Sequence, residues 1–266
     1  MRIGVVVPTL NSARTLATAL LSAREQQGCE TEVIVADSGS TDGTLEICAR
    51  LNVPTVYVPP GNLYQAINQG MRCLESPWVT YLNSDDLVFA DSYARLVSKG
   101  EASAADVVYG NGDFADAQGR FLYSLEAPSA GALQSLFEAG FFGFLPHAAV
   151  VRKAVLDELG GFDQRFRHVA DMEFFARACM AGKTFATIPY PSVAVFRLHP
   201  GQIGSVEKDV VVEELARLRG KRPIGRRLAG GLAIARWKLN NARQYALRWL
   251  RTGSLKRAAS AQGERS

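Results

Sequence analysis

The sequence predicts an α/β fold in which a mostly parallel central sheet is flanked by helices. Apolar, β-branched runs at Ile3–Val7 and Glu32–Ala36 are typical of parallel strands that are buried on both faces. Segments with apolar residues at helical spacing alternate with these strands, which requires crossover connections and therefore a doubly wound sheet. Polar residues follow the ends of the strands, at the edge where such sheets bind their ligands.

The first half of the chain contains four strands in this arrangement. The first ends at the segment Pro8–Ser12, where we expect Ser12 to cap a helix that carries Leu16. The second ends at Asp37 and is followed by a turn that reaches Thr44. The remaining expected elements are a helix over Leu45–Leu51, a strand over Val56–Val58, a helix over Leu63–Leu74 and a strand over Trp78–Leu82.

The fourth strand ends in Asn83-Ser84-Asp85-Asp86, which places an amide and two carboxylates at the mouth of the sheet. Hard oxygen ligands of this kind hold Mg²⁺ or Mn²⁺ against a diphosphate. The alternative is ordinary turn chemistry, which uses the same residue types. The metal and phosphate interpretation is favoured by the polar residues that fall at one edge of the predicted sheet, which are Thr9, Asn11, Asp37, Ser38, Asn83 and Asp85.

Other nucleotide-binding classes fit the chain less well. The turn after the first strand lacks Gly-x-Gly-x-x-Gly, which argues against a dinucleotide-binding oxidoreductase, and no Walker loop occurs. A nucleotidyltransferase stays open as an alternative, although the basic, Gly-rich loop that it should carry after its first strand is missing. The pattern that fits best is a nucleotide whose diphosphate is bound through a metal.

Four segments, in order and spacing, resemble the successive signatures of the family 2 glycosyltransferases with the GT-A fold: Val5–Asn11, Asp37–Thr44, Tyr64–Gly70 and Leu82–Asp86. The resemblance covers about the first 200 residues and is greatest to bacterial O-antigen and capsule enzymes. It implies a glycosyltransferase of the hexosyltransferase type, which moves a sugar with inversion from a nucleotide-diphosphate sugar to a hydroxyl of a glycan acceptor in cell-surface polysaccharide synthesis.

The resemblance also implies site residues. A divalent ion, Mn²⁺ or Mg²⁺, is expected on Asp85 and on His199, which lies in a segment that resembles a loop closing over the donor diphosphate. Asn83 replaces the first aspartate of the Asp-x-Asp motif and Gln65 stands where an acid is common, so a catalytically silent nucleotide-sugar-binding scaffold stays an alternative. The residues expected at the nucleotide sugar are Pro8, Thr9, Leu10, Asn11, Asp37, Ser38, Asn68, Asn83, Ser84, Asp85 and Arg197.

The general base is expected in the second half of the chain. Asp171 lies at the start of an apolar helix, where a carboxylate is stabilised and, by this prediction, still exposed. By resemblance it matches the aspartate of a Glu-Asp pair that takes the proton from the acceptor hydroxyl, with Ala170 in place of the glutamate. Asp163 and Glu173 are alternative bases, and an N-cap is the purely structural role for Asp171.

Two further features of the second half concern the acceptor side. The Phe- and Gly-rich segment Gly131–Phe144 is expected to form part of the acceptor wall. His147 is expected to begin a buried strand, as a structural residue or as a contact to acceptor or donor.

Composition bounds the size and the compartment. With 266 residues, 47% of them hydrophobic and 21% charged, the chain can bury one α/β core with an appendage. Its four cysteines show no paired spacing and the first strand begins at residue 3, so we expect no signal peptide and reduced thiols in the cytoplasm. No apolar run approaches the roughly 20 residues that span a bilayer.

The charge is divided along the chain. Residues 1–216 hold 16 Lys and Arg against 25 Asp and Glu, a net charge of −9, whereas residues 217–266 hold 14 against 1, a net charge of +13. We therefore predict a catalytic domain over residues 1–216, with a nucleotide half to about 110 and an acceptor half from about 111, and a basic helical tail over residues 217–266. Apolar residues recur in this tail at gaps of four and three: Leu228, Leu232, Ala235, Leu239, Ala242, Ala246 and Trp249.

A basic amphipathic helix of this kind lies in the plane of the lipid headgroups, where each Lys or Arg contributes about 1 kcal/mol near an anionic surface. We therefore expect a peripheral protein on the inner face of the cell membrane, acting on a lipid-linked acceptor. The alternative is a helix that packs on the catalytic domain with its charges solvated. Nucleic acid is not an expected partner, because the rest of the chain is acidic.

Overall fold

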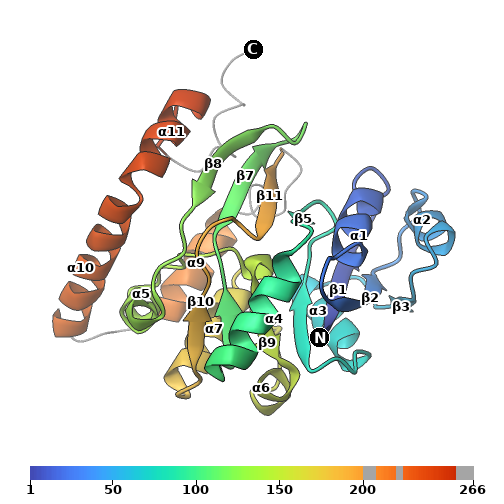
Figure 1. Ribbon diagram of the computed structural model, residues 1–266, viewed down its shortest axis with the longest axis horizontal. Helices are drawn as coiled ribbons and strands as arrows, with labels where there is room; N and C mark the ends of the chain where they lie inside the picture. The colour runs from blue at the N-terminus through green and yellow to red at the C-terminus, as the bar shows by residue number, and fades with distance from the viewer. Residues whose placement is uncertain (200–207, 220–223, 256–266) are drawn as a thin grey trace.

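The computed structural model describes residues 1–199, 208–219 and 224–255 (Figure 1). Strands and helices alternate along the first third of the chain as predicted, and each expected strand and helix is present. The bounds are β1 Arg2–Thr9, α1 Leu16–Arg24, β2 Glu30–Asp37, α2 Thr44–Arg50, β3 Thr55–Tyr57, α3 Leu63–Arg72 and β4 Trp78–Tyr81.

The central sheet has seven strands in the order β10-β6-β9-β4-β1-β2-β3. The added strands are β6 Val107–Tyr109, β9 Ala149–Arg152 and β10 Phe185–Thr187. Strand β9 runs antiparallel to both of its neighbours, whereas every other pair in this sheet is parallel. The prediction of a mostly parallel sheet is therefore confirmed, and the sheet takes strands from both predicted halves.

Helices cover both faces of this sheet. Side chains of β1 alternate between the two cores, with Val5 and Val7 on one face and Val6 on the other. Helix α3 approaches β1 closely at Gly70, where a Cβ atom would lie 2.5 Å from Val6 Cγ1. The first core includes α1, α2 and α4 Ser92–Ser103, and the second includes α3, α5 Leu133–Glu138, α6 Lys153–Glu158 and α7 Ala170–Met180.

A second sheet of four strands was not expected from the sequence. Its order is β5 Leu87–Val88, β11 Ala194–Leu198, β7 Gly112–Asp116 and β8 Phe121–Leu125. Strand β5 follows directly after the Asn83–Asp86 segment, and Val195 of β11 pairs with Leu87. This antiparallel pairing brings the end of β11 to the loop that follows β4. Two short 3₁₀ turns complete the connections, η1 Ala130–Ala132 and η2 Pro146–Ala148.

The C-terminal part is helical and packs on the domain. Helices α10 Ile224–Asn240 and α11 Ala242–Thr252 run beside α5 and β8 (Figure 1). The indole nitrogen of Trp237 donates to the carbonyl of Glu126 at 2.9 Å. The predicted boundary at residue 216 falls inside α9 Lys208–Arg219. No helix within residues 1–199, 208–219 and 224–255 combines the length and the apolar character needed to cross a bilayer.

Candidate active site

The loops after β1 and β2 are held together by one carboxylate. Thr9 and Asp37 are register partners at the ends of their strands, and Thr9 Oγ1 donates to Asp37 Oδ1 at 3.0 Å. The backbone N–H groups of Gly39 and Ser40 donate to Asp37 Oδ2, each at 2.9 Å. Burial alone would raise the pKa of Asp37, but these bonds and the Ser40 hydroxyl lower its pKa. An ionised Asp37 therefore fixes the geometry of both loops.

Asn11 extends this connection. Its backbone is left-handed, with φ of 51°, a conformation that asparagine tolerates better than most residues. In this conformation Asn11 Oδ1 accepts from the N–H of Thr41 at 2.9 Å, and its own N–H donates to Ser40 Oγ at 2.8 Å. Pro8 is buried within β1, and Leu10 is exposed at the tip of the loop.

The prediction that Ser12 caps α1 is wrong. The helix begins at Leu16, and no side chain forms a cap bond at its N-terminus. The Ser12 hydroxyl instead lies 2.8 Å from Ser84 Oγ, in the loop that follows β4. Ser40 and Asp42 make contacts within and across these turns. Ser40 Oγ donates to Asp37 Oδ1, and Asp42 accepts from the N–H of Ala13 and from Thr44.

Three of the predicted site residues converge beyond β4. Asp85 Oδ2 lies 2.7 Å from His199 Nε2, and both side chains are partly exposed. The guanidinium Nε of Arg197 donates to the backbone carbonyl of Asp85. Asp85 comes from the first half of the chain and the other two from the end of β11, so the β5–β11 pairing creates this cluster.

The Asp85 and His199 pair fits a divalent ion. A carboxylate oxygen and an imidazole nitrogen that meet at one point are ligand types that Mn²⁺ accepts, and Mg²⁺ prefers the oxygen. Octahedral coordination would need further oxygen ligands, which a diphosphate and water supply. Across the described parts of the chain, no group of three or more His, Cys, Asp and Glu is placed to hold a metal by itself.

The buried carboxylate beside this pair is one that the sequence did not single out. Asp86 is fully buried and accepts from Asn83 Nδ2 and from the backbone N–H of Arg197, each at 2.9 Å. His147 Nδ1 lies 3.6 Å from Asp86 Oδ2. Burial, together with the charge of Asp85, raises the pKa of Asp86. His147 itself lies in η2, just before the buried strand β9 that it was expected to begin.

Asp171 lies in the first turn of α7, as predicted, but the expectation that it is exposed is wrong. Its side chain is buried, and Tyr81 Oη donates to Asp171 Oδ2 at 3.1 Å. The N–H of Met172 donates to Oδ1 at 2.7 Å, whereas the Tyr64 hydroxyl, which also lies near this carboxylate, donates to the carbonyl of His168 at 3.0 Å. Burial raises the pKa of Asp171, since these bonds only partly offset the desolvation. The two tyrosines come from β4 and α3, so local sequence gave no sign of them.

Both alternative bases are engaged by arginine. Asp163 accepts the N–H and the guanidinium of Arg165, which lower its pKa although burial raises it. Glu173 forms a two-point ion pair with Arg177. Asp171, by contrast, accepts a hydrogen bond from Tyr81, the last residue of β4.

Asn68, which is also predicted at the nucleotide sugar, bonds another segment of the chain through its side-chain amide. Its amide donates to the carbonyl of Phe162 at 2.7 Å and accepts from the N–H of Phe162 at 2.9 Å. The side chain is buried in this clamp, which joins α3 to the turn before α7.

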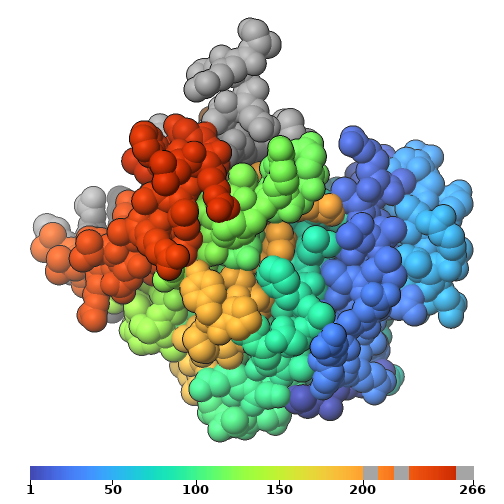
Figure 2. Space-filling model, turned by 45° about the horizontal axis from the view of Figure 1, so that its top comes forward, coloured from blue at the N-terminus to red at the C-terminus, as the bar shows by residue number. Residues whose placement is uncertain are grey.

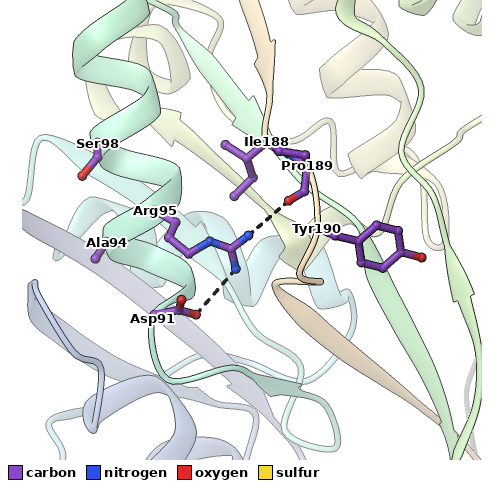
Figure 3. Close-up of a pocket in the computed structure, with 7 residues that line it drawn as sticks. All are labelled: Asp91, Ala94, Arg95, Ser98, Ile188, Pro189 and Tyr190. Carbon is purple, nitrogen blue, oxygen red and sulfur yellow. Dashed lines mark hydrogen bonds and ion pairs between the residues drawn. The ribbon is translucent and has the colours of Figure 1, made fainter.

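Outside the Asp85 cluster, the described residues line two hollows of note. One, of about 460 Å³, is lined by residues of α4 and of the segment after β10, and Arg95 there bonds Asp91 and the carbonyl of Pro189 (Figure 3). The other, of about 90 Å³, is largely apolar and lies between α5, α7 and α9. Its lining includes Phe137, Phe141 and Met172, so it contains part of the predicted acceptor wall.

Comparison with known sequences identifies relatives along the chain. The model of glycosyl transferase family 2 matches residues 4–160. A PGL/p-HBAD biosynthesis glycosyltransferase of Mycobacterium tuberculosis is 28% identical over 255 residues, which cover 92% of this chain and 94% of the relative. The succinoglycan biosynthesis protein ExoO of Rhizobium meliloti is 27% identical over 220 residues, which cover 76% of this chain and 62% of that protein.

Solved structures agree with the fold. The protein TarS of S. aureus, residues 1–349 with UDP-GlcNAc, has a TM-score of 0.63 at 18% identity, with 96% of this chain and 80% of that chain covered. The mannosyltransferase PcManGT of Pyrobaculum calidifontis, with GDP-Man and Mn²⁺, has a TM-score of 0.63 at 20% identity, covering 99% and 76%. The chain therefore belongs to glycosyl transferase family 2 and is a glycosyltransferase with the GT-A fold.

Proposed function

We propose that this glycosyltransferase moves a sugar, with inversion, from a nucleotide-diphosphate sugar to a hydroxyl of a lipid-linked glycan in cell-surface polysaccharide synthesis. The observation that carries the proposal is the 2.7 Å contact between Asp85 and His199, at the same sheet edge as the loops joined by Asp37. A relative that acts in succinoglycan biosynthesis and structural neighbours that bind UDP-GlcNAc or GDP-Man support it.

The donor would lie along this edge. The nucleoside would contact Thr9, Asn11 and Ser38, with Asp37 as the anchor of their loops, and the diphosphate would lie toward Ser84, Asp85 and Arg197. Asn83 would act indirectly, because its amide donates a hydrogen bond to Asp86. Asn68 would not contact the donor, because its amide bonds the backbone of Phe162. A divalent ion on Asp85 and His199 would offset the charge of the leaving diphosphate. The cation of Arg197 would stabilise the same charge.

Asp171 would act as general base. A buried carboxyl group with a raised pKa accepts a proton more readily at neutral pH than an ordinary aspartate does. The hydroxyl of Tyr81 occupies Asp171 Oδ2 in this structure, so an acceptor hydroxyl would take the place of that hydrogen bond. The proton of the acceptor hydroxyl would then pass to Oδ2 while its oxygen bonds to the anomeric carbon. The bond from that carbon to the diphosphate would break on the opposite face, and the nucleoside diphosphate would leave.

The acceptor would approach from the side of α5 and α7. The hollow of about 90 Å³ is lined by Phe137 and Phe141 and by Met172, the neighbour of Asp171. A largely apolar hollow on α7, the helix that carries Asp171, suits an acceptor that carries a hydrophobic carrier. The relative named for PGL/p-HBAD biosynthesis is consistent with such an acceptor.

The C-terminal helices would place the enzyme on an anionic membrane at the inner face of the cell membrane. All seven residues of the predicted apolar stripe are exposed, among them Leu232 at 73% and Leu239 at 75%. A different face of the same helices, with Trp237, Asn241 and Gln244, packs on the domain. Docking on the domain and binding to lipid are therefore compatible, because they use different faces of the tail.

The donor site can be tested with Asp85→Asn. Isothermal titration with UDP-, GDP- and dTDP-sugars in the presence of Mn²⁺ should show binding of one donor class to the native protein, and that binding should become independent of Mn²⁺ in the variant. Asp157→Asn, the same change in an exposed ion pair of α6, is the matched control and should bind like the native protein. Unchanged Mn²⁺-dependent affinity in Asp85→Asn would remove Asp85 from the site. Absence of both transfer and hydrolysis for every sugar nucleotide would instead favour a binding scaffold.

A further inference from the structure

The Asp85 and His199 pair depends on two chain segments that meet at one buried group. Asp85 follows β4, and His199 follows β11. Asp86 Oδ2 accepts from Asn83 Nδ2, on the β4 side, and Asp86 Oδ1 accepts from the backbone N–H of Arg197, on the β11 side. The two oxygens of one carboxylate thus fix both segments relative to each other.

His147 adds a third segment to this junction. It is 1% exposed, and its Nδ1 lies 3.6 Å from Asp86 Oδ2. Its ring lies nearly parallel to that of Phe196, with 22° between the planes and 6.0 Å between the centroids. Phe196 precedes Arg197 on β11, so His147 contacts both the carboxylate and the strand that the carboxylate holds. A buried carboxylate needs such partners, because desolvation without them is costly.

We propose that Asp86 and His147 are positioning residues that set the distance between Asp85 and His199 and so determine the affinity for the divalent ion. This inference rests on the proposed function, in which those two side chains hold the metal. Neither positioning residue would touch the ion or the donor. Groups that orient metal ligands in this way usually change metal affinity by about 10- to 100-fold when they are replaced.

The test uses the full chain with Mn²⁺ and UDP or GDP as probes, because the donor is not identified. Free Mn²⁺ is measured by electron paramagnetic resonance, and unfolding by a thermal scan of the same samples. His147→Leu removes the contact to Asp86, whereas His147→Asn places an amide nitrogen near the position of Nδ1. We expect His147→Leu and Asp86→Asn to weaken Mn²⁺ binding by about 10- to 100-fold, and His147→Asn to retain most of it.

A control separates this effect from loss of stability. Asp113 also joins two segments, because Ser124 and Ser192 both donate to its Oδ1, but it lies in β7 and has no contact with Asp85 or His199 among its described hydrogen bonds. Asp113→Asn should lower the unfolding midpoint and leave Mn²⁺ affinity unchanged.

Three outcomes would overturn the inference in different ways. If the native protein binds Mn²⁺ and the His147→Leu and Asp86→Asn variants bind it equally well, the positioning role is wrong and the proposed function stands. If affinity falls in Asp113→Asn as much as in these variants, the loss reflects stability alone. If the native protein does not bind Mn²⁺ with any nucleotide, the metal site of the proposed function fails first.

Discussion

Asp171 lies among aromatic rings, and its burial has a consequence for stability. Tyr81 donates to its carboxylate, and the ring of Phe162 packs against both Tyr81 and Tyr64. Because burial raises the pKa of Asp171, the folded state holds its proton more tightly than the unfolded state does. The free energy of unfolding therefore decreases as pH rises from the ordinary aspartate pKa of about 3.9 to the raised pKa of the folded state.

Asp171→Asn removes both the base and this penalty. We expect sugar transfer to fall by about 10²-fold or more, with donor affinity unchanged, because the amide cannot accept the proton. We expect the unfolding midpoint at pH 7 to equal or exceed that of the native protein, and any gain to vanish below about pH 3.9. Initial rates and thermal scans across this pH range measure both effects.

Asp163→Asn is the comparison variant, because the pKa of Asp163 is shifted in the opposite direction from that of Asp171. Hydrogen bonds from Arg165 lower the pKa of Asp163, so its charge stabilises the fold above the ordinary aspartate pKa and ceases to do so as pH falls through its lowered pKa. This variant should lose stability at pH 7. Native-like transfer by Asp171→Asn, with a large loss in Asp163→Asn, would move the base to Asp163.

Local sequence patterns predict where these side chains lie on helices and strands, but not which residues surround them. The helix start before Asp171 is a local signal, and it was predicted. The burial of Asp171 is produced by Tyr64 and Tyr81, which are at least 90 positions away in sequence. The same limit applies to Asp85 and Asp86, because the motif alone does not tell which of two adjacent carboxylates faces the solvent.

Among the helices and strands, long elements could be predicted from the sequence and short ones could not. Strands β1 and β2 have eight residues each and were recognised from their apolar runs. Strand β5 has two residues and β6 three, and such short segments gain their structure from pairing with distant strands. The pairing of β5 with β11 is what assembles the Asp85 cluster, so the fold was more predictable than the site.

Two adjacent glycines of helix α10 differ in the space around them. A Cβ atom at Gly230 would lie 2.6 Å from Ala139 Cβ and 3.2 Å from the carbonyl of Ser135, whereas at Gly231 it would meet nothing within 4 Å. Gly231→Ala should stabilise the fold by up to about 1 kcal/mol through helix propensity. Gly230→Ala should destabilise it by about 1–3 kcal/mol, because the new methyl group overpacks the contact with α5.

Urea unfolding followed by circular dichroism measures both changes, and proteolysis of α10 should become faster in Gly230→Ala. The two variants carry the same substitution one residue apart on one helix, so the gain from helix propensity is the same in both. Any difference in stability between them therefore reports the contact with α5. Equal stability of the pair would mean that α10 does not dock on α5 in solution.

On the scale of the whole molecule, the tail has an unusual distribution of polarity. Its contacts to the domain are largely polar, since Asn241 accepts from the N–H of Glu126 and Gln244 accepts from the N–H of Ser124. Its apolar stripe is exposed instead. Helices α10 and α11, which carry the stripe, form a ridge on one side of the molecule (Figure 2). The spacing in the sequence identified the stripe, but the domain-facing residues could not be predicted, because their partners lie more than 100 positions earlier.

We expect this ridge to bind anionic membranes. Deleting the tail would remove Trp237 from its contacts with Phe141 and Glu126, so substitutions in the stripe are the sharper test. Leu232→Glu combined with Leu239→Glu should weaken binding to phosphatidylserine vesicles by more than tenfold, because each buried leucine contributes about 1.5–3 kcal/mol and the new charges repel the lipid. Vesicle sedimentation at low and high salt measures this, and native binding should weaken as salt rises.

The matched control places the same charges away from the stripe. Ala102→Glu and Ala181→Glu add two acidic groups to exposed positions of the catalytic domain and should leave vesicle binding nearly unchanged. The stripe variant should keep its unfolding midpoint and its activity on a water-soluble acceptor while losing activity on a lipid-linked one. If the native protein ignores anionic vesicles at low salt, or if the stripe variant unfolds, the ridge does not face a membrane and its leucines serve the fold.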